Sequence, residues 1–468
     1  MAFAELQRDT VLDVVKLLRE GIDSVDPSIP SGVCEPGWAW SQRYIADTAH
    51  AMAGPNHTAW IRLANGQYYE TVPKQTMGAL VLRTMASAER LRNRDVLLLD
   101  EADTWPHNLW SKSSVAFHAK LSTSAFVGLK GAKLWYVNAH KGPYRVSRHY
   151  TEILERHRGF HSALSAAVRG TAMEGVLIPC HKDYPTFSVT ERKESGTADA
   201  EGWVQTVFSW YGVPFRVTED FSEEGIYALG GAGVVQKLSD EEIRAIFAHH
   251  VLVEGLAAAA LIKRGFGDLM GVEEMTKRPL FTGDYNERRG DFLPLPKSAN
   301  PPIFRALPGA ETISSFIWKE SSFAKDFERV AASGVLFRNR LGGTVATTAY
   351  HIHLDPAYLY GAGRQRHVYD LLDALVGAPF ENICANGQNV LALTRRAPDG
   401  ADLLLLENLN YDAEDEMLIR RRERPSSVEV MSSHGRWEQT DFTFADGLVR
   451  IPCDWPCYGV KVLRLRRL

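Results

Sequence analysis

The sequence predicts an α/β protein that begins with a helix-covered parallel sheet and ends in a β-sandwich. Up to about residue 140, strand-like runs alternate with helical stretches, and a fresh strand–helix series starts near residue 175. In the last third, short strands lie between Gly, Asp and Asn turns. Alternation of this kind is typical of βαβ units, and regularly punctuated short strands are typical of a sandwich. We expect three units, over residues 1–170, 171–300 (or to about 375) and 376–468.

Composition places the chain among ordinary globular proteins. Its 468 residues are 45% hydrophobic and 24% charged, and the formal net charge is -4. These values allow a sizeable core and give no electrostatic reason to expect nucleic acid or an anionic membrane as a partner. The N-terminal residues carry charges throughout, unlike a signal peptide, and no run approaches the roughly 18 uncharged apolar residues of a membrane span. We expect a cytoplasmic protein.

Cysteine and histidine patterns do not predict a metal site. The five cysteines are scattered and odd in number, which favours a reduced compartment over a disulfide framework. Only Cys453 and Cys457 are close together, and nothing nearby completes a zinc site. His149, His157 and His161 lie near helical spacing within one predicted helix over 144–168, but neighbouring arginines favour a packed or solvated face. We therefore expect neither a metal nor another cofactor.

The stretch Asp95–Asn108 holds the strongest candidate for chemistry in the first unit. An apolar run, Val96–Leu99, predicts a strand buried on both faces and leads into Asp100, Glu101 and Asp103. Carboxylates at the carboxyl end of such a strand lie where α/β folds place their active sites. The alternative interpretation is a helix cap followed by surface acids.

A second candidate lies at Glu35, which follows a short strand-like piece and precedes Pro-Gly, Trp38 and Trp40. Indole faces stack on sugar rings, so tryptophans beside carboxylates favour a carbohydrate site, while a turn with core-filling tryptophans is the alternative. Other side chains at or after predicted strand ends could bind hydroxyl groups or form structural hydrogen bonds. They are Arg62, Asn65, Trp105, His107, Asn108 and Asn138.

The middle of the chain predicts a second α/β unit. Strands are expected at 175–179, 214–218 and 226–229, and helices at 202–211 and from Ser239, where a capping box begins. The stretch Gly230–Gly233 lacks the spacing of a nucleotide-binding fingerprint, so it predicts a loop that leads into strand-like residues. Later strands at 334–352, 390–395, 403–408, 427–431 and 448–451 are typical of a β-sandwich, with a helix at 367–376 between them.

Three stretches carry a resemblance to a known family. LLLDEADTWPHNLWSKS, FHAKLSTSAFVGLKGAKLWYVN and LSDEEIRAIFAHHVLVEGLAAAALIKRGFGDLMGV together resemble the later half of family-42-type β-galactosidases, which are retaining glycoside hydrolases of the large (β/α)8 clan. The resemblance implies a barrel, a Rossmann-like trimerisation domain related to glutamine amidotransferases, and a small β-sandwich. It also implies a homotrimer that acts on a carbohydrate.

By this resemblance, residues 95–105 correspond to barrel strand seven and Glu101 to the nucleophile. Residues 131–138 correspond to strand eight. The family's first barrel half, with its Asn-Glu acid/base motif, has no counterpart, so the expected barrel is partial or truncated. Glu35 is then the best local candidate for the acid/base.

The sequence hypothesis is a retaining glycoside hydrolase that cleaves a β-linked hexoside such as a β-galactoside. Such an enzyme needs a nucleophilic carboxylate and a carboxylic acid about 5 Å apart, here Glu101 and Glu35. Asp103 and the tryptophans would complete the substrate site and raise the pKa of the acid. The alternative is a non-catalytic carbohydrate-binding or scaffold remnant. A glutamine amidotransferase is disfavoured because no glycine elbow surrounds Cys180.

Overall fold

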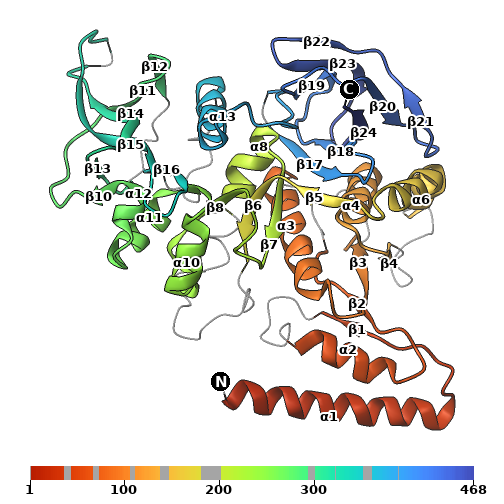
Figure 1. The fold of residues 1–468 in the computed structure, drawn as a ribbon. Helices are drawn as coiled ribbons and strands as arrows, with labels where there is room; N and C mark the ends of the chain where they lie inside the picture. Colours follow the sequence, from red (N-terminus) through yellow and green to blue (C-terminus); the bar gives the residue numbers. More distant parts are fainter. Residues whose placement is uncertain are drawn as a thin grey trace.

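A computed structural model describes residues 2–35, 44–66, 73–105, 111–136, 147–180, 202–293, 301–321, 323–350, 361–387 and 389–467. The described chain is a mixed α/β fold, with parallel β/α elements followed by antiparallel C-terminal sheets (Figure 1). None of the helices in these ranges is long and apolar enough to cross a membrane.

The first unit is a four-stranded parallel sheet in which neighbours follow in chain order. Its strands are β1 (Val33–Cys34), β2 (Trp60–Arg62), β3 (Leu97–Asp103) and β4 (Gly131–Trp135). Its helices are α1 (Ala2–Val25), α2 (Ile45–Ala53), α3 (Pro73–Leu91), α4 (Ser114–Val127), α5 (Arg148–Arg156) and α6 (Arg158–Ala167). Consecutive parallel order is what successive βα units produce.

This sheet is strongly curved. The ammonium of Lys133 on β4 lies 3.6 Å from the sulfur of Cys34 on β1, across two intervening strands. In a flat sheet these strands would be about 14 Å apart, beyond the reach of one lysine side chain. The face that carries Cys34 and Lys133 is therefore concave.

The strand over Asp95–Asn108 is longer than the sequence predicts. β3 continues through Asp100, Glu101 and Asp103, which the sequence places after the strand, and its first three residues are only half-buried. Backbone pairing with β4 extends from Leu99 to Asp103, so pairing with a neighbour overrides the low strand propensity of the acids.

The second unit is an eleven-stranded sheet, of which five strands are parallel in the order β7-β6-β8-β9-β16. These strands are β6 (Val176–Pro179), β7 (Phe215–Thr218), β8 (Ile226–Leu229), β9 (His250–Val253) and β16 (Thr344–Thr348). The helical segments are η3 (Val204–Phe208), α8 (Ser209–Tyr211), α9 (Ala232–Lys237), α10 (Asp240–Phe247), α11 (Gly255–Lys263), α12 (Gly267–Met270) and α13 (Ala362–Val376).

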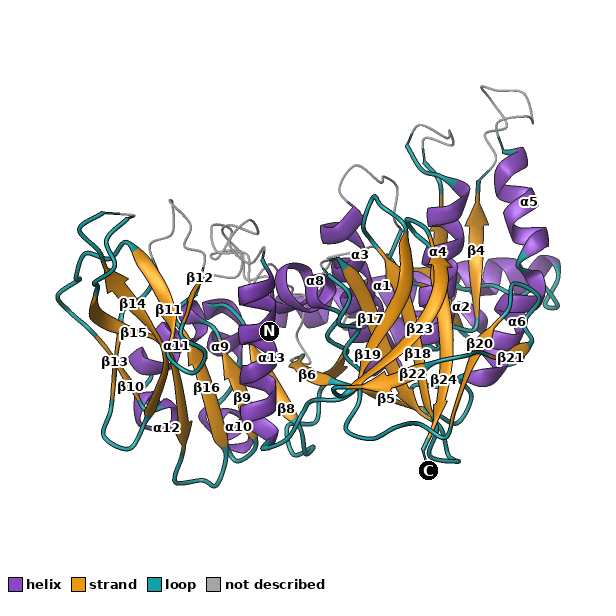
Figure 2. Ribbon diagram, turned by 90° about the horizontal axis from the view of Figure 1, so that it is seen from above, coloured by secondary structure: helices purple, strands orange, loops and turns teal. Residues whose placement is uncertain are grey.

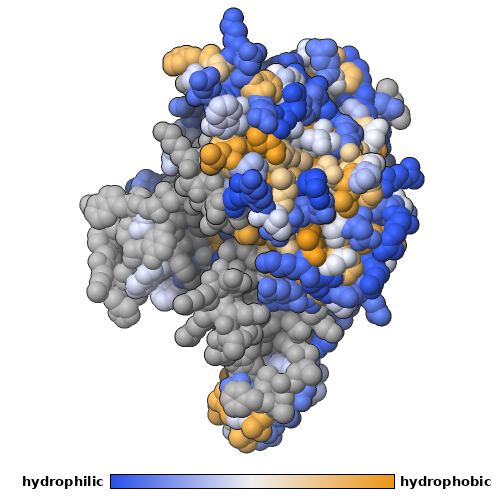
Figure 3. Space-filling model, turned by 90° about the vertical axis from the view of Figure 1, so that its left-hand side faces the viewer, coloured by the Kyte–Doolittle hydropathy of each residue, from blue (hydrophilic) through white to orange (hydrophobic). Residues whose placement is uncertain are grey.

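An antiparallel extension widens this sheet at the β16 side. It consists of β10 (Val272–Glu274), β11 (Gly283–Asn286), β12 (Asp291–Leu293), β13 (Phe304–Ala306), β14 (Glu311–Trp318) and β15 (Glu328–Arg338). Figure 3 views the molecule from this side, where hydrophobic and hydrophilic residues intermingle on the surface.

Two sequence expectations in this unit were wrong. Of the run predicted as a sandwich strand, residues 334–338 belong to β15 and residues 344–348 form β16, which pairs in parallel with β9. Alternation along a strand does not reveal which sheet the strand joins. The stretch Gly230–Gly233 leads into helix α9, not into a strand. Gly231 adopts φ +74°, and this left-handed turn suffices for a β–α connection.

The C-terminal unit packs a six-stranded sheet against a three-stranded one. The larger sheet holds β21 (Trp437–Gln439), β20 (Ser427–Met431), β24 (Val460–Arg466), β18 (Asp402–Asn408), β17 (Val390–Arg396) and β5 (Ala172–Glu174). The smaller holds β19 (Glu414–Arg420), β23 (Leu448–Trp455) and β22 (Thr443–Ala445). Residues of both sheets share one buried apolar cluster. β5, which comes from the middle of the chain, pairs with β17 at the edge of the larger sheet (Figure 2).

Candidate active site

The candidate site lies at the carboxyl ends of β1, β2 and β3. Alternation along β3 separates its acids, because successive side chains of a strand point to opposite faces. Asp100 points toward α4, where it forms a buried ion pair with Lys120. Glu101 lies on the other face, in an ion pair with Arg62 of β2. Asp100 is therefore structural, and Glu101 is the acid that the strand presents to the site.

One short segment, Ala64–Gly66 after β2, holds two carboxylates. The Ala64 N–H donates to the Glu35 carboxylate over 2.9 Å, and the Gly66 N–H donates to the Glu101 carboxylate over 3.1 Å. Glu35 directly follows β1, and its own N–H donates to the Arg62 carbonyl over 2.7 Å. The two glutamates thus flank one loop.

Asn65 fixes this loop. Its side-chain oxygen accepts from the Glu101 N–H over 2.9 Å, and its amide donates to the Thr84 hydroxyl of α3 over 2.9 Å. The Asn65 side chain is 1% exposed and bridges β3 to α3. Because the oxygen and the nitrogen of this buried amide both form hydrogen bonds, Asn65 fixes the backbone whose N–H groups contact both glutamates.

The two glutamates have different environments. Glu101 has the Arg62 guanidinium as its counter-charge. Glu35 is 4% exposed, and burial raises the pKa of its carboxyl group; the Ala64 N–H and the charges of Arg90 and Arg62 oppose this rise only in part. The Ser87 hydroxyl of α3 lies 3.5 Å from the same carboxylate. Burial favours the protonated form of Glu35.

Lys133 adds a second cation to the concave face. It pairs in register with Glu101 across β3 and β4, so both side chains point to the same side of the sheet. The ammonium of Lys133 and the guanidinium of Arg62 both interact with Cys34, which is exposed. The Glu101 carboxylate therefore lies beside two cations on the concave face.

The structure brings together four of the residues singled out from the sequence: Glu35, Arg62, Asn65 and Glu101. Asp103 accepts the Trp105 N–H over 2.7 Å at the end of the same strand, and Trp105 is 51% exposed, 6.5 Å from Trp135 between ring centroids. Five further candidates lie outside the described residues: Trp38, Trp40, His107, Asn108 and Asn138.

Sequence reasoning missed the supporting residues Thr84, Ser87, Arg90 and Lys133. The first three lie on α3, where a polar side chain on a helix face gives no local sign of its long-range partner. Lys133 lies within a segment whose sequence predicts only a strand. The pairing of β4 with β3, which the sequence does not reveal, brings it beside Glu101.

Two of the three histidines of the predicted helix over 144–168 pack against α4, and the third is exposed. His157 lies between the end of α5 and the start of α6, so the predicted single helix is two helices. The His157 ring stacks on the His118 ring of α4, with 3.8 Å between ring centroids. His161 approaches the same ring with a nitrogen–nitrogen distance of 3.1 Å, while His149 is exposed beside Glu152. Within the described ranges, no cluster of His, Cys, Asp and Glu fits a metal ion.

Comparison with known proteins relates the fold to glycoside hydrolases. The chain is similar to α-L-fucosidase isoenzyme 2 from Paenibacillus thiaminolyticus, with a TM-score of 0.57 and 12% identity over 100% of this chain and 80% of that one. Rhamnosidase from Novosphingobium sp. PP1Y matches with a TM-score of 0.45 and 11% identity, over 90% of this chain and 38% of that one. No family model and no curated protein matches the sequence. The first similarity extends to the fold alone.

Proposed function

We propose that the protein is a retaining glycoside hydrolase in which Glu101 is the nucleophile and Glu35 the acid/base. The observation that carries the proposal is the pair of glutamates on either side of Ala64–Gly66, one beside a guanidinium and one desolvated. Retaining hydrolysis requires a nucleophilic carboxylate and a carboxylic acid, and the ion pair of Glu101 and the burial of Glu35 support these two roles. The fold similarity to a fucosidase supports the same class of reaction.

In the proposed mechanism, the ionised Glu101 attacks the anomeric carbon while Glu35 gives its proton to the leaving glycosidic oxygen. The resulting glycosyl ester at Glu101 is then hydrolysed by a water that Glu35 deprotonates. Arg62 holds the Glu101 carboxylate in position, and Asn65 holds the loop that contacts both acids. Substrate contacts from Trp38, Trp40, Asp103, Trp105, His107, Asn108 and Asn138 belong to the proposal.

Our proposed substrate is a β-linked hexoside such as a β-galactoside, as the family-42 resemblance implies. The curved four-stranded sheet would correspond to part of the (β/α)8 barrel of that family, and the homotrimer and cytoplasmic location are proposals of the same origin. Because the similar solved structure is named as an α-L-fucosidase, α-L-fucosides belong in the first substrate panel. Sedimentation equilibrium of the full chain would test the trimer.

The test is hydrolysis of p-nitrophenyl β-D-galactoside, β-D-glucoside, α-L-fucoside and α-L-rhamnoside. We expect Glu101→Ala to lose activity by about 10⁴-fold or more, with partial recovery in azide, which can take the place of the missing nucleophile. Glu35→Ala should slow alkyl glycosides by about 10²- to 10⁴-fold and the activated aryl glycosides much less. Glu241→Ala, an exposed carboxylate on α10, is the matched control.

Wild type that hydrolyses none of the four sugars would exclude the enzyme and favour the non-catalytic carbohydrate-binding alternative. Activity that survives in Glu101→Ala would remove the nucleophile from its assigned position. Equal losses on alkyl and aryl glycosides in Glu35→Ala would remove Glu35 from the acid role.

A further inference from the structure

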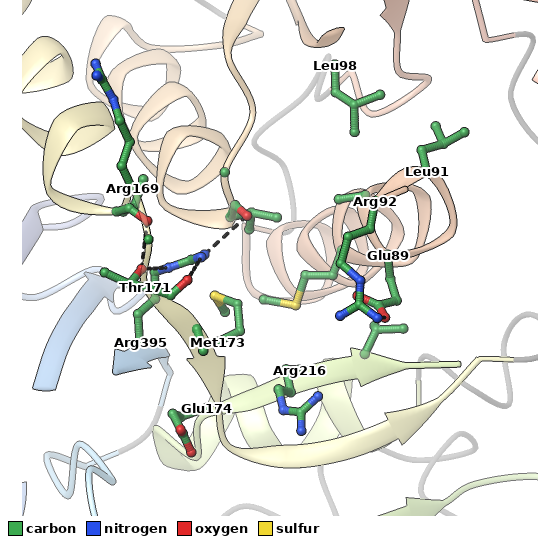
Figure 4. Close-up of a pocket in the computed structure, with 18 of the residues that line it drawn as sticks. Glu89, Leu91, Arg92, Leu98, Arg169, Thr171, Met173, Glu174, Arg216 and Arg395 are labelled. Carbon is green, nitrogen blue, oxygen red and sulfur yellow. Dashed lines mark hydrogen bonds and ion pairs between the residues drawn. The ribbon is translucent and has the colours of Figure 1, made fainter. Parts of the chain in front are cut away.

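A cavity lies at the opposite end of the first sheet from the two glutamates. Figure 4 shows this cavity at close range. Its volume is about 670 Å³, and its wall includes Val96 and Leu98 at the amino end of β3 and Lys130 just before β4. Since β3 runs from this cavity toward Glu101, the two sites occupy opposite ends of the same strand. The cavity is within the size range of small-molecule sites.

The charged side chains of this cavity do not balance. Its lining has five cations and three carboxylates, an excess of two positive charges: Arg92, Lys130, Arg169, Arg216, Arg395, Glu89, Glu174 and Glu223. Two carboxylates are already used, because Glu89 pairs with Arg92 over 3.1 Å and Glu223 pairs with Arg216. Across the described parts of the chain, Lys130, Arg169 and Arg395 have no ion-pair partner.

Arg395 is the most buried of the three. It extends from β17 and is 8% exposed, and its guanidinium donates to the Thr171 hydroxyl and to the carbonyls of Thr171, Phe126 and Val127. All of these acceptors are neutral. The carbonyls at the end of α4 offset only part of the charge, and burial lowers the pKa of Arg395 to about 10.

Lys130 and Arg169 lie beside two glycine turns at the cavity. Gly128 ends α4 with φ +115°, two residues before Lys130, and Gly170 adopts φ +70° directly after Arg169. Both cations are exposed, so a ligand can reach them from solvent. Figure 4 shows Thr171 and Arg395 on one wall of the pocket, opposite Leu91 and Leu98, whereas the side chain of Arg169 extends away from Arg395.

We propose that this cavity binds a small ligand that bears a phosphate or sulfate group, held by Lys130 and Arg395. The oxygens of such a group accept several hydrogen bonds at once, and ammonium and guanidinium groups both donate them. The apolar part of the lining, which includes Leu91, Val96 and Leu98, accommodates an organic body attached to the anion. The site does not depend on the proposed glycosidase activity, because it is separate from both glutamates.

Isothermal titration calorimetry of the full chain tests the site at constant ionic strength. The probes are inorganic phosphate, inorganic sulfate and glucose 6-phosphate, with glucose as the uncharged control. We expect saturable binding of the anions and none of glucose. Tighter binding of the ester than of phosphate would identify an organic ligand, and equal binding would identify the free anion.

Lys130→Ala should weaken anion binding at least about tenfold, because it removes an exposed charge of the site without disturbing a buried partner. Arg169→Ala, whose side chain extends away from Arg395, and Lys263→Ala, an exposed lysine on α11, should bind as wild type does. Absence of saturable binding in wild type, or unchanged affinity in Lys130→Ala, would overturn the proposal. Arg395 would then serve only to hold the end of α4.

Discussion

Strands β4 and β18 show how differently the two ends of the chain are built. Four of the five residues of β4 are exposed and none is buried, whereas all seven residues of β18 are buried. β18 contains four leucines and β4 contains one, so composition accounts for part of the contrast. In the described structure, β18 has a strand on each side, β17 and β24, while β4 has only β3.

This difference leads us to expect different roles for the C-terminal sheets and the first sheet. The C-terminal sheets bury their apolar side chains in one shared cluster, and they resemble a closed core. On the first sheet, Arg62 and Lys133 instead place two cations beside Glu101 on the concave face. We expect the C-terminal unit to carry much of the folding free energy and the first unit to carry the reaction.

A matched pair of leucines gives the largest expected effect. Leu404 on β18 is 0% exposed, and Leu404→Ala should lower the free energy of unfolding by about 2–5 kcal/mol, since it leaves a cavity in the shared core. Leu134 on β4 is 45% exposed, so Leu134→Ala should cost less than about 1 kcal/mol. Urea unfolding followed by circular dichroism measures both.

If the Leu134 variant lost as much stability as the Leu404 variant, the free edge of β4 would be covered in solution. That result would break the contrast between the two strands and favour a partner at this edge. Sedimentation of the Leu134→Asp variant would then separate a folding defect from a lost interface.

Glu407 provides a pH-dependent effect where the two regions meet. It lies on β18, is 0% exposed and accepts a 3.4 Å hydrogen bond from Thr123 of α4. Burial raises the pKa of this carboxyl group to about 8. Because the folded-state pKa exceeds the unfolded value of about 4.3, stability is fully present at low pH and falls as the pH rises from there toward 8.

The slope from this group should reach about 1.4 kcal/mol per pH unit between pH 5 and 7.5. Glu407→Gln should remove that slope, so the variant is closest to wild type near pH 5 and more stable than wild type near pH 8.5. Urea midpoints at several pH values measure it, with Glu438→Gln on exposed β21 as control. A slope that persists in Glu407→Gln belongs to other groups.

Local patterns in the sequence could predict strand and helix types and the position of the strongest acids. The apolar run before Asp100, the acid after β1 and the capping box at Ser239 each leave a local signature, and the structure contains each element. The capping box forms as expected, with reciprocal hydrogen bonds between Ser239 and Glu242.

Long-range pairing could not be predicted in the same way. Nothing near Asn65 indicates that its amide reaches Thr84, and nothing in β5 indicates that three residues before the parallel sheet join β17. β16 has the sequence pattern of a sandwich strand but joins β9 in parallel. These outcomes depend on which surfaces meet, which a periodicity in one segment does not encode.

The contrast between the first sheet and the C-terminal sheets also predicts a difference in cysteine reactivity, which is the smallest of these effects. Cys34 on β1 is exposed beside two cations, whereas Cys384 is buried in the C-terminal core, where burial raises the pKa of its thiol to about 12. Thiolates react and thiols do not, so Cys34 should react with Ellman's reagent at least about 10²-fold faster than Cys384. Cys34→Ser should remove the fastest phase at a stability cost below about 0.5 kcal/mol. In 6 M guanidinium the thiols should react alike, and a fast phase that survives in native Cys34→Ser would belong to another thiol, such as the half-buried Cys453 or Cys457.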